Sequence, residues 1–341
     1  MRNPKPHMGT TLQNNSVSAR RSAGYVAGRS VVSTGCWPAV IELWIPLTIA
    51  AAFMQNLRSA LQKYLKAKLT TTGASYVRFL YAMPFALLYL FSVNQFGGHP
   101  IPDVNVKFLI YCLLGGLTQI LFTFLLVYLF SFRNFAVGTT YSKTETMQVA
   151  LLGLILLGDT VSIMGLIAIA ISLFGVMVLS VAQTKITVKN LFTSLFEKQS
   201  LIGLTCGAFL GASVVFYRGA AWALDDGEII MRAAFSLTVA VVMQTVIMGI
   251  YIRFREPGQW TEVVRNWRPA LGVGIAGVLA SIFWFSAFTL ENAAYVRALG
   301  QIELLFTFVA SILFFKEKTS PLELVGIFLI AVAIIILLIT N

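Results

Sequence analysis

Runs of about 20 mainly apolar residues follow one another along most of this chain. Each run is long enough to cross the hydrocarbon core of a bilayer as a helix. Strands of a membrane barrel would instead alternate apolar and polar residues in segments of about 10. We therefore predict an all-α integral membrane protein with about ten transmembrane helices. The predicted spans are residues 44–62, 75–94, 108–130, 135–157, 161–182, 201–224, 229–251, 270–290, 293–315 and 321–339.

The composition agrees with a membrane protein, because only 11% of the residues are charged and 57% are hydrophobic. A soluble domain carries about 25% charged residues. The net charge of +11 would indicate a nucleic-acid partner in a soluble chain. Here the lysines and arginines lie mostly in the predicted loops, where they orient a membrane protein. We therefore expect the lipid bilayer as a partner and no nucleic acid.

The sequence lacks the motifs that metal, disulfide or ATP chemistry would need. Its cysteines, Cys36, Cys112 and Cys206, have no metal-binding spacing. None of the four aspartates falls within a predicted span, so an enzyme with a membrane-embedded acidic metal cluster is not expected. No phosphate-binding loop of the form G-x-x-x-x-G-K-S/T occurs. We expect no enzyme, no metal and no cofactor, with energy supplied by a gradient or a partner.

Residues 1–43 are polar and basic, with no acidic residue before Glu42. No apolar run there is long enough for the core of a signal peptide. A transit peptide, or a twin-arginine signal at Arg20 and Arg21, is an alternative interpretation. We predict a disordered basic tail that lies outside the fold.

One predicted span, residues 135–157, carries Lys143 and Glu145 near its middle. A charge at that depth costs roughly 2.5–3.5 kcal/mol, and such residues are usually functional. The pattern returns about 158 residues later, where Glu303 takes the place of Glu145 and Gln301 that of Lys143. Two copies of a charged membrane helix indicate a transport pathway.

The chain divides into two copies, residues 44–182 and 201–341, joined by an amphipathic connector at 183–200. Five spans per copy is an odd number, so we predict two inverted five-helix repeats. Corresponding loops have opposite charge bias, as inverted copies require. Loop charges place both chain ends outside the cell, whereas the basic tail favours the opposite orientation, and both alternatives stay open. Residues 256–268 are predicted as either a short interfacial helix or a loop.

Glu145 and Glu303 are the main candidates for chemistry. Each carboxylate could face a central cavity and hold a cationic substrate group or take up protons. A structural ion pair within the bundle is the alternative. On a straight helix Lys143 lies about 200° from Glu145, so the two would not share a face. Lys143 is itself a candidate for binding an anion.

Arginines near the span ends could line a cavity or could extend to the lipid headgroups. Their recurrence in copies of opposite orientation makes pure lipid anchoring less natural, and both interpretations stay open. The candidates for the substrate or proton pathway are Lys143, Glu145, Tyr141, Gln301, Glu303, Arg297, Arg78, Arg232, Arg58 and Trp284. Glycines of the third, fifth, eighth and tenth spans are predicted to be packing contacts.

Two segments carry a resemblance to a known family. They read K-T-E-T-M-Q-V-A-L-L-G-L-I-L-L-G-D-T-V-S-I-M-G-L-I from Lys143 and Q-I-E-L-L-F-T-F-V-A-S-I-L-F-F-K-E-K-T-S-P-L-E-L-V-G-I from Gln301. In each, a small-residue helix, an acidic turn at Asp159 or Glu317, and a glycine-containing helix follow one another. The chain resembles the EamA-type members of the drug/metabolite transporter superfamily over about residues 44–339. We expect the acidic turn residues to cap the following helix.

The resemblance implies ten helices in two inverted repeats and no catalytic residue. It also implies gradient-driven export, or facilitated diffusion, of a small polar metabolite across a bacterial inner membrane. An amino acid or related zwitterion would fit, with Lys143 and the arginines holding its carboxylate and a glutamate holding its amine. A phosphorylated, nucleotide-linked or lipid-linked metabolite is the alternative within transport. A non-transporting membrane scaffold or sensor is the alternative of another class.

Overall fold

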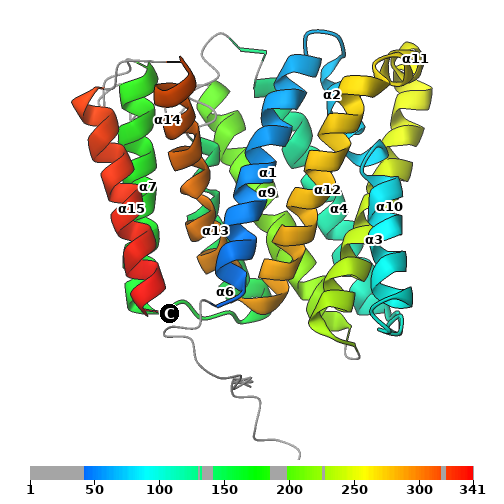
Figure 1. The fold of residues 1–341 in the computed structure, drawn as a ribbon, viewed down its shortest axis with the longest axis horizontal. Coiled ribbons are helices and arrows are strands. Elements are labelled where there is room, and N and C mark those ends of the chain that lie inside the picture. The colour runs from blue at the N-terminus through cyan, green and yellow to red at the C-terminus, as the bar shows by residue number, and fades with distance from the viewer. Residues whose placement is uncertain are drawn as a thin grey trace, which may run out of the picture. The chain divides into compact units, whose positions relative to one another are not determined.

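The computed structural model describes residues 42–129, 131–132, 141–184, 198–224, 227–315 and 320–340. Nearly all of the predicted basic tail and most of the predicted connector lie outside these residues. The described part of the chain folds into helices and contains no strand (Figure 1). The helices are α1 Trp44–Leu65, α2 Thr71–Leu80, α3 Met83–Gln95, α4 Val106–Leu129, α6 Glu145–Leu157, α7 Ile163–Thr184, α9 Lys198–Ala223, α10 Ile229–Arg255, α11 Pro257–Arg265, α12 Trp267–Leu290, α13 Ala293–Gly300, α14 Ile302–Phe315 and α15 Pro321–Thr340.

Seven helical stretches among the described residues are long and apolar enough to cross a membrane. They are α2 with α3 taken together, α4, α7, α9, α10, α12 and α15. The prediction of an all-helical membrane protein is therefore confirmed. The count of ten spans and the inverted repeat stay predictions, because α1, α6, α13 and α14 do not meet the same criterion.

The boundaries of several helices differ from those predicted. α9 begins at Lys198, so the last residues assigned to the connector belong to this helix. Residues 257–265 form α11, which confirms the short helix rather than the loop at this position. A proline at the start of α3 interrupts the predicted span 75–94 after Leu80.

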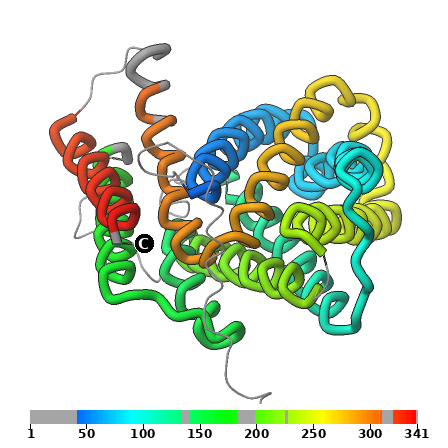
Figure 2. The backbone as a smooth tube through the Cα atoms, turned by 60° about the horizontal axis from the view of Figure 1, so that its bottom comes forward, coloured from blue at the N-terminus to red at the C-terminus, as the bar shows by residue number. Residues whose placement is uncertain are grey.

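Small residues set the closest helix packing. α1 with α12, α4 with α9, and α7 with α15 make the most extensive contacts, and Figures 1 and 2 show α7 and α15 side by side. A Cβ added at Gly326 would lie 2.8 Å from the backbone nitrogen of Leu179, and one at Gly115 would lie 2.8 Å from the ring of Tyr217. Only glycine lets these helices approach so closely, as in other membrane bundles. The predicted packing role is confirmed for these two glycines.

α6 is ended by a glycine that turns the chain sharply. Gly158 has a φ of 72°, and the backbone N–H groups of Gly158 and Asp159 donate to the carbonyl oxygens of Leu154 and Gly153. This is the pattern of a helix C-terminus closed by a left-handed residue. The predicted capping role of Asp159 is wrong, because the hydroxyl of Ser162 caps α7 by accepting from the N–H of Gly165 at 3.0 Å.

Two of the predicted spans are interrupted at the positions of their polar residues. Residues 141–142 are helical, Lys143 and Thr144 form a turn, and α6 starts at Glu145. In the other copy α13 ends at Gly300, and α14 starts one residue after Gln301. The expectation of a straight helix through Lys143 and Glu145 is therefore wrong. The turn removes the geometric reason for placing these two side chains on opposite faces.

Candidate functional site

The two helix interruptions each place a glutamate at the start of a helix. Glu145 is the first residue of α6 and Glu303 is the second residue of α14. The free N–H groups at a helix N-terminus and the helix dipole both stabilise a negative charge there. Both carboxylates are also buried, with 1% of Glu145 and 9% of Glu303 exposed. The fold thus holds two carboxylates deep within the bundle.

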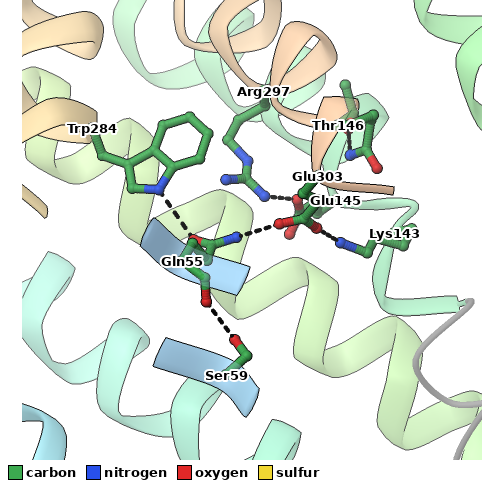
Figure 3. A network of polar contacts seen from close by, with 9 residues as sticks. Gln55, Ser59, Lys143, Glu145, Thr146, Trp284, Arg297 and Glu303 are labelled. Carbon is green, nitrogen blue, oxygen red and sulfur yellow. Dashed lines mark hydrogen bonds and ion pairs between the residues drawn. The ribbon is translucent and has the colours of Figure 1, made fainter. Parts of the chain in front are cut away.

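Each carboxylate pairs with a cation from the other half of the chain. The guanidinium of Arg297 in α13 donates to Oε1 of Glu145, and Nζ of Lys143 donates to Oε1 of Glu303 (Figure 3). Ion pairs of this kind offset the cost of burying charge only while both partners are present. Removing one partner typically costs about 3–5 kcal/mol. The interruption after Lys143 and the one at Gln301 are therefore joined by two crossed ion pairs.

Neutral side chains fix the orientation of these charged groups. Gln55 of α1 donates from Nε2 to Oε2 of Glu303 at 2.9 Å and accepts from Nε1 of Trp284 at 3.1 Å. The guanidinium of Arg297 lies over the Trp284 ring at 4.7 Å, which is within the range of a cation–π contact. Figure 3 shows these side chains meeting around the two carboxylates. α1 and α12 therefore take part in positioning the ion pairs.

A cavity of about 330 Å³ lies beside the ion pairs. Its volume falls in the range that small-molecule sites occupy. The lining residues come from α1, α4, α6, α9, α13 and α14 and from residues 142–143 before α6. They are Gln55, Asn56, Arg58, Ser59, Phe122, Leu126, Ser142, Lys143, Glu145, Leu210, Arg297, Glu303 and Leu304.

A second hollow of about 450 Å³ lies between α6 and α7. Met147, Leu151, Leu154 and Leu166 contribute to its walls, and its lining is almost wholly apolar. Exposed apolar side chains on a membrane protein face lipid, so this surface suits an acyl chain. We place the candidate site at the smaller cavity, because the buried charged groups meet there.

The structure brings half of the ten predicted candidates together at the cavity. Lys143, Glu145, Arg297, Glu303 and Arg58 line the cavity. The other five candidates, Trp284, Gln301, Arg78, Tyr141 and Arg232, do not line the cavity.

Trp284 contacts the cavity residues through Gln55, and Gln301 donates to Oγ1 of Thr146 at 3.0 Å. Arg78 is buried in α2 and donates to Oγ1 of Thr123 at 2.8 Å.

Two predicted candidates lie away from the cavity. Tyr141 is 3% exposed and packs in an apolar cluster with Val181. Arg232 lies near the start of α10, where its Cγ would be 3.8 Å from a Cβ added at Gly227. Neither residue lines the cavity.

Gln119, a polar residue of the third predicted span, joins a buried polar group outside the cavity lining. Oε1 of Gln119 accepts from the hydroxyl of Tyr217 at 3.2 Å and from Nε2 of Gln244 at 2.8 Å. These residues come from α4, α9 and α10. Their only signal in the sequence is polarity within an apolar run, which interhelical packing also explains.

A second set of charges lies where α6 and α12 end. Nε of Arg218 in α9 donates to Oδ2 of Asp159 at 3.1 Å, and the same guanidinium donates to the carbonyl oxygens of Phe288 and Glu291. Burial raises the pKa of the Glu291 carboxyl, although its hydrogen bond from the Asn292 backbone and the charge of Arg218 act in the opposite direction. Arg218 of α9 therefore ties the end of α6 to the end of α12.

The fold and the buried charges together define a multi-pass helical membrane protein with an internal polar site. Residues 198–339 match the sequence model of the EamA-like transporter family. The match covers the second copy of the predicted repeat and confirms the predicted resemblance to EamA-type transporters there. A search of curated proteins found no match.

A solved structure shares the fold of this protein. Its title is "Crystal structure of protein", and it superposes with a TM-score of 0.62 at 12% sequence identity. The similarity covers 86% of this chain and 94% of the other. At this identity the likeness shows a shared fold and no shared activity.

Proposed function

We propose that the protein is a secondary transporter, and not an enzyme, that moves a small polar metabolite across a bacterial inner membrane. The observation that carries the proposal is the pair of charged helix interruptions that meet beside a cavity. Interrupted membrane helices with their ends at the substrate are a recurrent feature of secondary transporters. Export driven by a gradient, with proton uptake as one source of energy, is the direction that we favour.

We further propose that residues 44–182 and 201–341 are inverted repeats that rock about the cavity. In such an arrangement α1 corresponds to α9 and α4 to α12. The extensive α1–α12 and α4–α9 contacts would then be equivalent, and α7 would pair with its own counterpart, α15. This agreement supports the repeat, and with it the count of ten spans.

The crossed ion pairs would connect the two repeats during the cycle. Arg297–Glu145 and Lys143–Glu303 each join the first copy to the second. A change in the angle between the copies would therefore act directly on both pairs. Alternating access needs such an element with two arrangements, and the helix interruptions provide places where the backbone can bend.

Counterflow in liposomes tests the proposal. Purified protein would be reconstituted into vesicles loaded with unlabelled alanine, putrescine, glucose, AMP or glucose 6-phosphate, and uptake of the same labelled compound would be measured. We expect at least one compound to accumulate beyond the level in protein-free vesicles. No accumulation of any compound, with folded protein in the vesicles, would favour the scaffold or sensor alternative.

Variants of the charged site test its part in transport. We expect Glu145→Gln and Lys143→Ala to lower the counterflow rate at least about tenfold, which corresponds to roughly 1.4 kcal/mol. Arg265→Gln is the matched control, because Arg265 forms an exposed ion pair with Glu262. Size-exclusion profiles would select folded protein for each variant. Wild-type rates in both site variants would show that the site is wrongly placed.

A further inference from the structure

The cations at the central site outnumber the carboxylates. Arg58, Lys143 and Arg297 line the cavity, as do Glu145 and Glu303. Both carboxylates are already engaged, Glu145 with Arg297 and Glu303 with Lys143. Arg58 is thus left as a cation in the cavity wall without a carboxylate partner in the described part of the chain.

Arg58 is buried and incompletely hydrogen-bonded. Only 2% of its surface is exposed, and its Nε has no hydrogen-bond partner among the described residues. Extension to the lipid headgroups does not explain it, because its side chain runs toward α12. A Cβ added at Gly277 would lie 3.5 Å from Cδ of Arg58. An arginine keeps its charge in proteins, so this guanidinium needs a counterion.

A second arginine reaches the same place from another helix. Cγ of Arg78 would lie 3.8 Å from the same Cβ at Gly277, so both side chains pack over one glycine of α12. Arg78 donates to the neutral hydroxyl of Thr123, and none of the ion pairs among the described residues includes it. The side chains of two buried arginines therefore pack over the same glycine next to the cavity that Arg58 lines, and neither has a carboxylate partner among the described residues.

We propose that the transported metabolite is a small organic acid whose carboxylate or phosphate group binds Arg58, with Arg78 adding to the positive field. This inference rests on the proposed transport function and names its substrate class. The planar guanidinium presents paired donors that match the oxygens of both groups. A cation would meet an unfavourable field, and a zwitterion would find no free carboxylate for its ammonium group.

Thermal stabilisation of the wild-type protein tests the substrate class without any variant. The probes are succinate and glycerol 3-phosphate as acids, alanine as a zwitterion, putrescine as a cation, and glycerol as a neutral compound. Phosphatidylglycerol tests a lipid phosphate as the source of the anion. We expect one of the soluble acids to raise the melting temperature. Stabilisation by none of the acids, or only by the lipid, the cation, the zwitterion or the neutral compound, would overturn the inference.

Variants then test the residue. We expect Arg58→Gln to weaken binding of the stabilising acid about tenfold or more, because a hydrogen bond to a charged group is worth roughly that factor. Arg58→Lys keeps the charge but lacks the paired donors, so we expect it to weaken binding less than Arg58→Gln does. It replaces Arg58→Gln in the measurement if that variant does not fold. Arg265→Gln is the control. Unchanged affinity in the Arg58 variants would overturn the inference.

Failure of this inference can be told apart from failure of the proposed function. An acid that binds through Arg58 but does not accumulate in counterflow would support the anion site and contradict transport. Counterflow of putrescine or alanine, without binding of any acid, would support transport and contradict the anion site.

Discussion

Trp284 is held on three sides at the centre of the site. Its ring stacks on Phe288 at a centroid distance of 5.4 Å, lies under the guanidinium of Arg297, and donates from Nε1 to Gln55. The fourth contact is with Gly300, where an added Cβ would lie 2.7 Å from Cη2 of the ring. The absence of a side chain at Gly300 is therefore a condition for this arrangement.

Gly300→Ala is expected to displace the Trp284 ring and destabilise the protein by about 1–3 kcal/mol, the usual cost of overpacking. The melting temperature in detergent measures this effect. Gly258→Ala is the matched control, because nothing lies within 4 Å of a Cβ added at Gly258. An equal change in the two variants would contradict the expected close contact.

At the scale of residues, the sequence predicted the charged groups better than their geometry. Lys143, Glu145 and Glu303 could be selected because charge is costly within an apolar run. The pairing of Lys143 with Glu303 could not be predicted, because the argument from helix periodicity assumed a regular helix through position 143. A two-residue turn changes the direction of every side chain before it, and no proline or glycine marks this turn. The lack of a carboxylate partner for Arg58 within the described part of the chain depends on how several helices pack, which no local pattern shows.

At the scale of elements, Arg218 connects the end of α6 to the end of α12. Its guanidinium donates to the carboxylate of Asp159 and to the carbonyl oxygens of Phe288 and Glu291. Both Arg218 and Asp159 are buried, with 6% and 8% of their side chains exposed. The strength of such a pair depends on its isolation from water.

Asp159→Asn is expected to lower the stability by about 3–5 kcal/mol, because it leaves the charge of Arg218 buried without its partner. Glu262→Gln removes an exposed ion pair with Arg265 and is expected to cost less than about 1 kcal/mol. Thermal melting of both variants in the same detergent makes the comparison. Similar losses in the two variants would show that the Arg218 pair is not shielded from water.

The positions of the long helices could be predicted from the sequence, and their interruptions could not. A run of apolar residues fixes the depth of a helix in the membrane within a few residues. The same run does not show where a turn interrupts the helical backbone hydrogen bonds. The interruption between α13 and α14 lies at Gln301, in a stretch that also carries Arg297, Gly300 and Glu303, and Gly300 there packs against the Trp284 ring.

At the scale of the whole molecule, the charged residues that line the cavity lie outside the seven spanning stretches. α1, α6, α13 and α14 fail the length or hydropathy criterion that the seven spanning stretches meet. Their polar side chains need partners inside the bundle, since the bilayer offers none. We expect the surrounding apolar helices to supply the lipid-facing wall.

The orientation of the bundle can be tested by labelling two exposed positions. Gly227 lies beside Pro102, and the 27 residues of α10 then carry the chain to α11. A helix of that length spans about 40 Å, so Asp103 and Thr261 belong to opposite ends of the bundle. With Cys36 replaced by serine, we expect an impermeant thiol reagent to label Asp103→Cys from one side of the membrane only and Thr261→Cys from the other. Labelling of both from the same side would contradict a membrane-spanning α10.

Arg58, which has no carboxylate partner among the described residues, has a consequence for the kinetics of the whole cycle. If the cavity closed in the empty protein, the buried charge of Arg58 would lose the open space beside it without gaining a counterion, which costs several kcal/mol. With an acid bound, the same movement buries a neutralised pair. We therefore expect the return of the empty protein to be the slow step, so that exchange of one acid for another is faster than one-way release. In a cell such a protein would act as an exchanger. The concentration of the acid that enters would then set the rate at which the exported acid leaves.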